Sequence, residues 1–294
     1  MGIVTAGALA EHMVNGFVLG ALYIILALGV WIILGLLGFV NFAHGAMYTL
    51  GAYAAMEVGK RIGFWPALVI SPVVVGILGM IVEAAIMRRF YKEIPELSLL
   101  FTFGLAMFIE QALRILWGPA GYNIFPPVAV SGPLVFGGFS YSRYRVFALA
   151  VILVTVVALW WFLERTRFGT IIRAGSRDPE MVQVLGINLA PVFTFVFGLG
   201  VSMAALAGLL AAPLGQVEPA MGNAVAMAAF VVVVIGGIGS FWGVILSGLL
   251  VGEVVGIMKF LWAPASEASM YILMALVLLV RPRGLFGERW VRFE

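Results

Sequence analysis

Apolar runs long enough to form membrane helices follow one another along almost the whole chain, with short polar segments between them. A helix needs about 20 apolar residues to cross a lipid bilayer. Only 11% of the 294 residues are charged and 63% are hydrophobic, so a water-soluble globule of this size would lack the polar surface to cover itself. These features exclude a soluble enzyme, a disordered protein and a nucleic-acid-binding protein. The alternation typical of an outer-membrane β-barrel is not seen either.

The runs predict an all-α polytopic membrane protein that forms a single transmembrane domain over residues 1–294. We expect about eight or nine transmembrane helices. The runs lie at 13–37, 42–57, 65–87, 97–117, 145–163, 190–213, 223–238, 242–262 and 267–281. The runs at 42–57 and 223–238 are the right length for half-helices or re-entrant segments as well as for full crossings. The sequence leaves that choice open.

Basic residues gather in three places and orient the chain. The clusters are Arg88, Arg89 and Lys92; Arg165, Arg167, Arg173 and Arg177; and Arg281, Arg283, Arg289 and Arg292. The positive-inside rule places all three in the cytoplasm and the Gly-, Pro- and Tyr-rich segment 118–144 outside. The N-terminus is then outside if 42–57 crosses fully and inside if it is re-entrant. No cleavable signal peptide is expected, because the first basic residue is Lys60.

The longest polar stretch, 164–189, is expected at the cytoplasmic surface. Asp178, followed by Pro179 and Glu180, is typical of a helix start with an N-cap and an acidic first turn. Three apolar side chains then fall on one face of that helix: Met181, Val184 and Leu185. Gly186 and Asn188 would end the helix. The segment therefore predicts a short amphipathic helix, and a plain connecting loop is the alternative.

The phrase at residues 38–45 is the most unusual local feature. It places Asn41, Phe42, His44 and Gly45 at the start of a short apolar helix. Backbone amides at a helix N-terminus favour anions, including a substrate carboxylate, and a helix broken at membrane depth must line a cavity or be buried in protein. The phrase therefore suggests a pore or gate element. The alternative is a tight turn in which Asn41 caps the helix and His44 bonds a neighbouring carbonyl.

Three carboxylates lie inside the apolar runs, away from the run ends. Such charges are costly and usually face the bundle interior or a water-filled path. Glu110 has Arg114 four residues on, which favours a structural ion pair, and Glu83 lies near Arg88 and is given no role. Glu253 has no such neighbour, so we expect it to face the translocation path or a subunit interface.

Two further patterns concern packing. Gly248, Gly252 and Gly256 recur every four residues and predict close helix packing. The phrase Ile-Gly-Phe-Trp at 62–65 is echoed by Ile-Gly-Ser-Phe-Trp at 238–242. The expected topology runs the two following helices in opposite directions, so the echo hints at an inverted repeat of the kind common in transporters.

Several chemistries lack the residues they need. No P-loop phrase or H-E-x-x-H motif is present, there is no cysteine, and there are only two histidines. We therefore expect no metal, no cofactor and no catalytic site in this chain.

Four phrases, taken together, resemble a known family. They are GLLGFVNFAHGAMYTLGAY at 35–53, RAGSRDPEMVQVLGIN at 173–188, VVVVIGGIGSFWGVILSGLLVG at 231–252 and VLLVRPRGLFG at 277–287. They occur in the order and spacing of the permease subunits of bacterial ABC importers for branched-chain amino acids, of the LivH type. The same family also serves urea, short amides and some aromatic acids, so the resemblance does not select the substrate.

The resemblance implies a multi-pass protein of the bacterial inner membrane that works by ATP-driven alternating access. It also implies partners: a second permease subunit (LivM-like or a homologous copy), two cytoplasmic ATPases and a periplasmic binding protein. Segment 173–188 is then similar to the coupling helix that docks on the ATPase. The coupling residues it implies are Arg173, Arg177, Asp178, Glu180 and Gly186.

We expect Asn41, Phe42, His44, Gly45 and Glu253 along the translocation path. Two other functions stay open: an ion-gradient-driven secondary transporter, which would use intramembrane carboxylates, and a passive channel for urea or water.

Overall fold

The computed structural model describes residues 6–287 except residues 39, 92–93 and 137–138. Lys92, Arg289 and Arg292 of the basic clusters therefore lie outside the described residues. The described chain forms these α-helices: α1 (Ala6–Leu37), α2 (His44–Ile62), α3 (Phe64–Ala85), α4 (Pro95–Trp117), α5 (Arg143–Arg165), α6 (Arg167–Arg177), α7 (Pro179–Val184), α8 (Leu189–Ala211), α9 (Met221–Gly236), α10 (Phe241–Trp262) and α11 (Ser266–Val280).

Each of the nine predicted runs is helical, so the prediction of an all-α membrane protein is confirmed. Among the described residues, six helical segments are long and apolar enough to span a membrane: Glu11–Leu37, Phe64–Ala85, Glu96–Trp117, Arg143–Arg165, Leu189–Leu214 and Phe241–Val280, the last containing both α10 and α11. Helix α9 is a shorter apolar helix of 16 residues. The outer faces of α3, α4 and α5 expose large apolar side chains such as Val69, Phe108 and Leu153, as a surface in contact with lipid would.

The few other elements are short. They are the 3₁₀ turns η1 (Met87–Phe90), η2 (Val128–Val130), η3 (Ala212–Leu214) and η4 (Ala263–Ala265), and the strands β1 (Pro133–Phe136) and β2 (Phe139–Ser142). The strands form an antiparallel hairpin that pairs Pro133 with Ser142. The hairpin is fastened to α1, since the Tyr141 hydroxyl donates to Asn15 Oδ1 at 3.3 Å.

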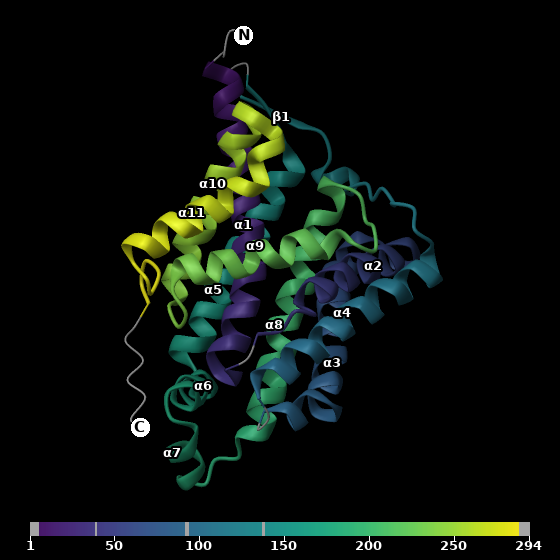
Figure 1. Ribbon diagram of the computed structural model, residues 1–294. Helices are drawn as coiled ribbons and strands as arrows, with labels where there is room; N and C mark the ends of the chain where they lie inside the picture. Colours follow the sequence, from purple (N-terminus) through teal and green to yellow (C-terminus); the bar gives the residue numbers. More distant parts are fainter. Residues whose placement is uncertain (1–5, 39, 92–93, 137–138, 288–294) are drawn as a thin grey trace.

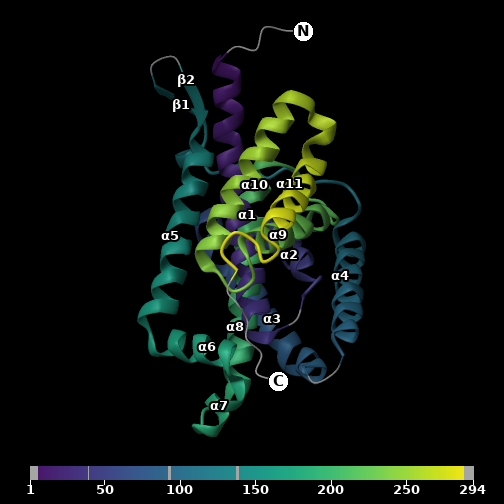
Figure 2. The same ribbon diagram turned by 60° about the vertical axis from the view of Figure 1, so that its left-hand side comes forward.

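The molecule has one long axis, and its helices either run along this axis or lie across it. Helices α1, α5 and α8 run lengthwise, whereas α2 and α9 cross the body (Figure 1). The hairpin and the start of α1 lie at one end, which we call the hairpin end, and α6 and α7 lie at the other, which we call the basic end (Figure 2). The connection between α3 and α4 is also at the basic end. The sequence left the side of the N-terminus open, and this separation agrees with the alternative that places the start of α1 on the same side as 118–144.

Helices α1–α4 and α8–α11 make corresponding contacts, with α1 corresponding to α8, α2 to α9, α3 to α10 and α4 to α11. Helix α3 packs on α8 as α10 packs on α1, and α2 packs on α8 as α9 packs on α1. Helices α1 and α8 contact each other, as do α2 and α9. Gly63 and Gly239, with φ angles of 93° and 96°, stand at matching breaks before α3 and α10. This is the inverted repeat that the sequence echo indicated.

Small residues let the central helices approach closely. A side-chain carbon on Gly29 of α1 would lie 2.5 Å from the Gly200 carbonyl oxygen of α8, and one on Gly200 would lie 2.7 Å from the Gly29 oxygen. The glycines of α10 pack on α1 in the same way, with Gly252 against Gly20 and Gly256 against Gly16. The predicted packing stripe is therefore confirmed, and its neighbour belongs to this chain.

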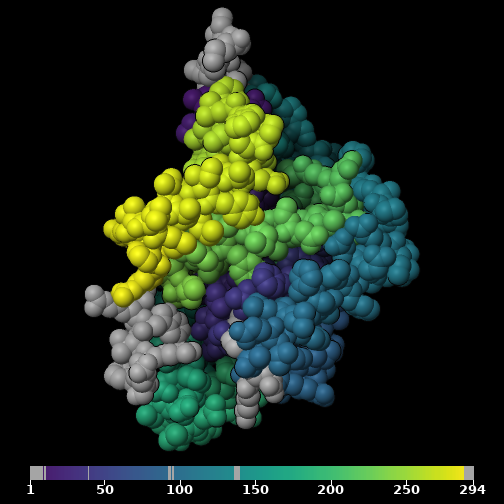
Figure 3. All heavy atoms as spheres, viewed as in Figure 1, coloured from purple at the N-terminus to yellow at the C-terminus, as the bar shows by residue number. Residues whose placement is uncertain are grey.

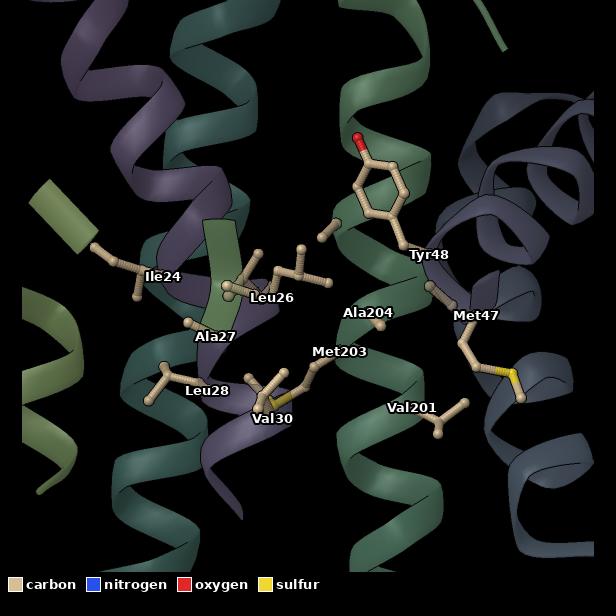
Figure 4. Packing of buried hydrophobic residues seen from close by; sticks show 14 of the residues in the cluster. Ile24, Leu26, Ala27, Leu28, Val30, Met47, Tyr48, Val201, Met203 and Ala204 are labelled. Atoms are coloured by element: carbon tan, nitrogen blue, oxygen red, sulfur yellow. The ribbon is translucent and has the colours of Figure 1, made fainter. Parts of the chain in front are cut away.

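The buried core lies where α1, α2 and α8 meet. Leu26 and Val30 of α1, Met47 of α2, and Val201 and Met203 of α8 are buried there (Figure 4). Helix α9 covers this core on one face, between α10–α11 on one side and α4 on the other (Figure 3). The polar positions predicted at the start of α2 adjoin this core.

Candidate translocation and coupling sites

The break between α1 and α2 places Asn41 in the protein interior. Its side chain is buried, and its Oδ1 accepts a hydrogen bond from the Ala43 backbone N–H at 3.0 Å. Its backbone oxygen accepts from the His44 N–H at 3.2 Å, which closes the turn before the helix. The Asn41 side-chain nitrogen Nδ2 is buried and has no hydrogen-bond partner in the described chain. Asn41 therefore supports the helix start and leaves one buried donor unused.

His44 is fully buried and joins α2 to α1. Its Nε2 lies 3.1 Å from the Leu26 carbonyl oxygen. A carbonyl oxygen only accepts, so Nε2 carries the proton and donates it. The other ring nitrogen, Nδ1, is buried with no partner among the described residues. Gly29 provides the space for the ring, because a side-chain carbon there would lie 2.9 Å from His44 Cε1.

The N-terminal turns of α2 and α9 meet at Gly45 and Gly222. Each glycine lies against the backbone carbonyl of the other, so neither position has room for a side chain. Both helices begin with a backbone hydrogen bond from the first helical residue to the residue three positions earlier. In α2 the His44 N–H donates to the Asn41 oxygen, and in α9 the Met221 N–H donates to the Glu218 oxygen, each at 3.2 Å. Two positive helix ends thus converge in the middle of the body.

Helices α4 and α9 support this junction from the side. The Phe42 N–H donates to Thr102 Oγ1 at 3.2 Å, and the Phe42 ring packs edge-on against Phe230 with centroids 5.6 Å apart. Glu110 accepts from Arg114 at 2.7 Å, which confirms the predicted ion pair. Glu110 also accepts from Asn223 Nδ2 at 3.1 Å, which ties α4 to the first turn of α9.

Glu253 lies apart from this junction. It faces α1 at Gly16, where a side-chain carbon would lie 3.3 Å from Glu253 Oε2, and that oxygen is buried without a hydrogen-bond partner in the described chain. Gly16 is thirteen residues before Gly29, the neighbour of His44. At a rise of about 1.5 Å per residue, that is roughly 20 Å along α1. The structure therefore does not bring Glu253 together with Asn41 and His44.

The basic end contains a sharp corner between α5 and α6. Gly169 packs directly on the carbonyl oxygens of the last turn of α5, and the Thr166 hydroxyl caps α6 by accepting from the Gly169 N–H at 3.0 Å. Arg173 bonds the Leu163 carbonyl oxygen and lies 3.5 Å from Glu164. Arg173 therefore holds the corner within this chain. Helix α6 was not predicted, because a polar segment with several arginines is also typical of a connecting loop.

Helix α7 begins where the sequence predicted. The Asp178 side chain accepts from the Met181 N–H at 2.9 Å, as an N-cap does. Gly186, with φ +83°, ends the turn, and the Ile187 N–H reaches back to the Val182 oxygen in a Schellman motif. The prediction that Asn188 ends this helix is wrong, because Asn188 caps α8 by accepting from the Ala190 N–H at 3.0 Å.

The apolar face of α7 is not covered by the rest of this chain. Met181 is 55% exposed, Val184 81% and Leu185 71%, whereas Val182 is the buried residue of the helix. Arg177 and Glu180 are also on the exposed side. The predicted amphipathic helix is confirmed, and the plain connecting loop is wrong. A small apolar face rimmed by charges at the tip of a membrane protein suits a protein partner.

Sequence reasoning missed a polar cluster at the same end, centred on Glu83. The fully buried Glu83 carboxylate accepts from the Tyr91 hydroxyl at 2.8 Å, from Arg88 Nη2 at 3.2 Å and from the Thr194 hydroxyl at 2.6 Å. Burial, and then the charge of Glu83, raise the pKa of Tyr91, so its phenol stays a donor. The nearness of Glu83 to Arg88 in the sequence was a signal, but Thr194 is 111 residues away.

Replacing Asp178 with Ala is expected to loosen α7 alone. The change removes the acceptor of the Met181 N–H, which typically costs a helix about 1 kcal/mol. Hydrogen exchange of the α7 amides should then be about fivefold faster, while exchange in α8 is unchanged. Asp178→Asn keeps the acceptor and should exchange like the wild type. Equal exchange rates in the Ala and Asn variants would contradict the cap.

Several known proteins similar to this chain are branched-chain amino acid transport permeases. Residues 12–281 match the family described as "Branched-chain amino acid transport system / permease component". The chain is 31% identical to the high-affinity branched-chain amino acid transport system permease protein LivH of Escherichia coli and 29% identical to BraD of Pseudomonas aeruginosa, each over 95% of both chains. It is 28% identical to LivM of Escherichia coli over 90% of this chain and 67% of LivM. No solved structure matches this chain.

Proposed function

The chain belongs to the permease component family of branched-chain amino acid transport systems, and we propose that it carries a branched-chain amino acid across the bacterial inner membrane as one permease of an ABC importer. The observation that carries the proposal is the match over nearly the whole chain, 95% of both this protein and LivH. Its relatives are named as transport permeases, and the proposal gives this chain no catalytic step of its own.

We propose that the second permease is a LivM-like subunit. The likeness to LivM extends over 90% of this chain, so the two would share one fold and could pair through related surfaces. A homologous copy of this chain is the alternative pairing. A periplasmic binding protein would deliver the amino acid at the hairpin end.

One of the two ATPases would bind at the basic end of this chain through α6 and α7. The exposed face formed by Met181, Val184 and Leu185 would enter an apolar groove of the ATPase, and Arg177 and Glu180 would contact polar groups at its rim. Arg173, Asp178 and Gly186 would act indirectly. They hold the α5–α6 corner and the two ends of α7 in place.

The translocation path would pass the junction of α2 and α9. Two helix N-termini converge there, and the amide of Asn41 leaves a buried donor unused. An amino acid carboxylate is the kind of anion that such helix ends attract. Phe42, His44 and Gly45 fix the position of the α2 terminus through Thr102, Leu26 and Gly222. Glu253 is not included, because its carboxylate lies against Gly16.

Reconstitution tests this function directly. The permease pair, the ATPases and the binding protein in liposomes should accumulate labelled leucine only when ATP is supplied. Excess unlabelled valine or isoleucine should compete with leucine, and urea, acetamide and phenylalanine should not. Uptake driven by an ion gradient without ATP would support a secondary transporter instead. Flux through the permease alone would support a passive channel.

A further inference from the structure

The buried Glu83 cluster joins three separate parts of the chain at the basic end. Glu83 lies in the last turn of α3, Arg88 in η1 and Thr194 in the second turn of α8. The Thr194 hydroxyl donates to Glu83 Oε2 at 2.6 Å and accepts from Arg88 Nη2 at 2.6 Å. Thr194 is therefore the one member of this cluster that belongs to α8, and it contacts both charges of the ion pair.

This arrangement is not one that stability alone requires. A carboxylate at the C-terminal end of a helix opposes the helix dipole, and a fully buried charge is costly even when it is paired. A well-packed apolar group would hold α3 and α8 together at least as firmly. The cluster instead provides short, directional bonds at one point.

The bond from Thr194 to Glu83 links α8 directly to α3 at this end. A cavity of about 440 Å³ adjoins the cluster, lined by Met80, Arg88, Asn188, Ala190, Pro191, Thr194 and Phe195. A second, of about 480 Å³, lies between Arg88, Tyr91 and the turn from Gly186 to Ala190. Two open hollows therefore flank the cluster beside the start of α8. Farther along, the two helices pack tightly, with Gly79 against Val201 and Gly76 against Gly198.

Helix α8 follows α7 after only four residues, and it contacts α1, α2 and α3. A displacement of α7 by an ATPase would reach the body first at the start of α8. We propose that Glu83, Arg88 and Thr194 are positioning residues that fasten this start to α3, so that α3 and α8 move together when α7 is displaced. The inference rests on the proposed function, because it assigns the cluster a part in coupling ATP hydrolysis to transport.

Thr194→Val tests the inference, since it removes the hydroxyl from α8 and keeps the side-chain shape. The measurement is the number of amino acids transported per ATP hydrolysed by the complete reconstituted transporter, with its melting temperature recorded on the same samples. We expect the ratio to fall about tenfold, the size of a typical coupling energy between sites, while ATP hydrolysis continues. Thr194→Ser should keep the wild-type ratio. Thr155→Val is the matched control, because the Thr155 hydroxyl donates within α5 only.

Glu83→Gln is the second variant, which removes the charge. Its single acceptor oxygen can accept from Thr194 or from Tyr91 but not from both, because the two hydroxyls bond different oxygens of the Glu83 carboxylate. One variant that assembles is enough to test the inference. We expect the number of amino acids transported per ATP hydrolysed to fall in both variants. A wild-type ratio in an assembled Thr194→Val or Glu83→Gln transporter overturns the inference. A fall of hydrolysis and uptake in equal proportion also overturns it, because that is the behaviour of a purely structural anchor. Failure of the proposed function looks different, since the wild type itself would then lack ATP-dependent uptake.

Discussion

Gly45→Ala is expected to destabilise the folded permease strongly, although it adds a single methyl group. The new carbon would meet the Gly222 carbonyl oxygen and, at 2.7 Å, the Ala226 side chain. Overpacking a core by one or two carbons typically costs about 1–3 kcal/mol. The upper end applies here, because the obstructing oxygen belongs to the backbone of α9 and cannot rotate away. Gly222→Ala should behave alike, since its methyl group would meet the Gly45 oxygen and, at 2.6 Å, Thr49 Oγ1.

The measurement is the yield of monodisperse permease after detergent extraction, together with its melting temperature and with uptake in cells. Gly104→Ala is the matched control, because Gly104 lies in a helix with no atom within 4 Å of the added carbon. Alanine is the better helix former by roughly 0.5–1 kcal/mol, so this control should be neutral or slightly stabilising. Normal yield and melting for Gly45→Ala would show that α2 and α9 are not in contact in the working transporter.

The helices could be predicted from the sequence because membrane crossing leaves a local signal. Run length placed nine of the helices within a few residues of their observed ends, with two differences. Helix α1 begins at Ala6, seven residues before its predicted run, and α2 ends later than its run. Helix α2 continues to Ile62, beyond the apolar run that ends at residue 57. Its last turn carries Lys60 and Arg61, which suit the negative end of the helix and lie 3.5 and 4.0 Å from Glu57. An apolar run ends at such charged residues, whereas the helix continues through them.

The candidate sites show where local signals stop. The Glu110–Arg114 pair and the Asp178 cap could be predicted because their partners lie within four residues. His44 bonds a backbone oxygen eighteen residues away, on another helix, and Glu83 bonds a hydroxyl 111 residues away. Nothing in the spacing of those residues indicates the contact. Helix α6 is an intermediate case, because Thr166 is a good N-cap and Ile172 and Gly175 lie on one face, where they pack on the body.

Val184→Glu is expected to abolish ATP-driven uptake by preventing the ATPase from binding. Val184 is 81% exposed and lies in the apolar face of α7, so the permease itself should fold as before. In the complex the new carboxylate would be buried in an apolar groove without a partner. Changes at the centre of an interface cost roughly 2–4 kcal/mol, which is about 30- to 1,000-fold in affinity. Co-purification of the ATPase with a tagged permease is the measurement.

Val128→Glu is the control for this change, because it adds the same charge at a position that is 89% exposed. Val128 lies in the 118–144 segment, which the predicted topology places on the opposite side of the membrane from α7. It should bind the ATPase and transport like the wild type. The cap variant Asp178→Ala should fall between the two, since it loosens α7 without charging its apolar face. If Val184→Glu retained the ATPase and normal uptake, the ATPase would have to bind a different surface. The exposed face of α7 would then need another partner, because an apolar face beside the charges of Arg177 and Glu180 is costly to leave in water.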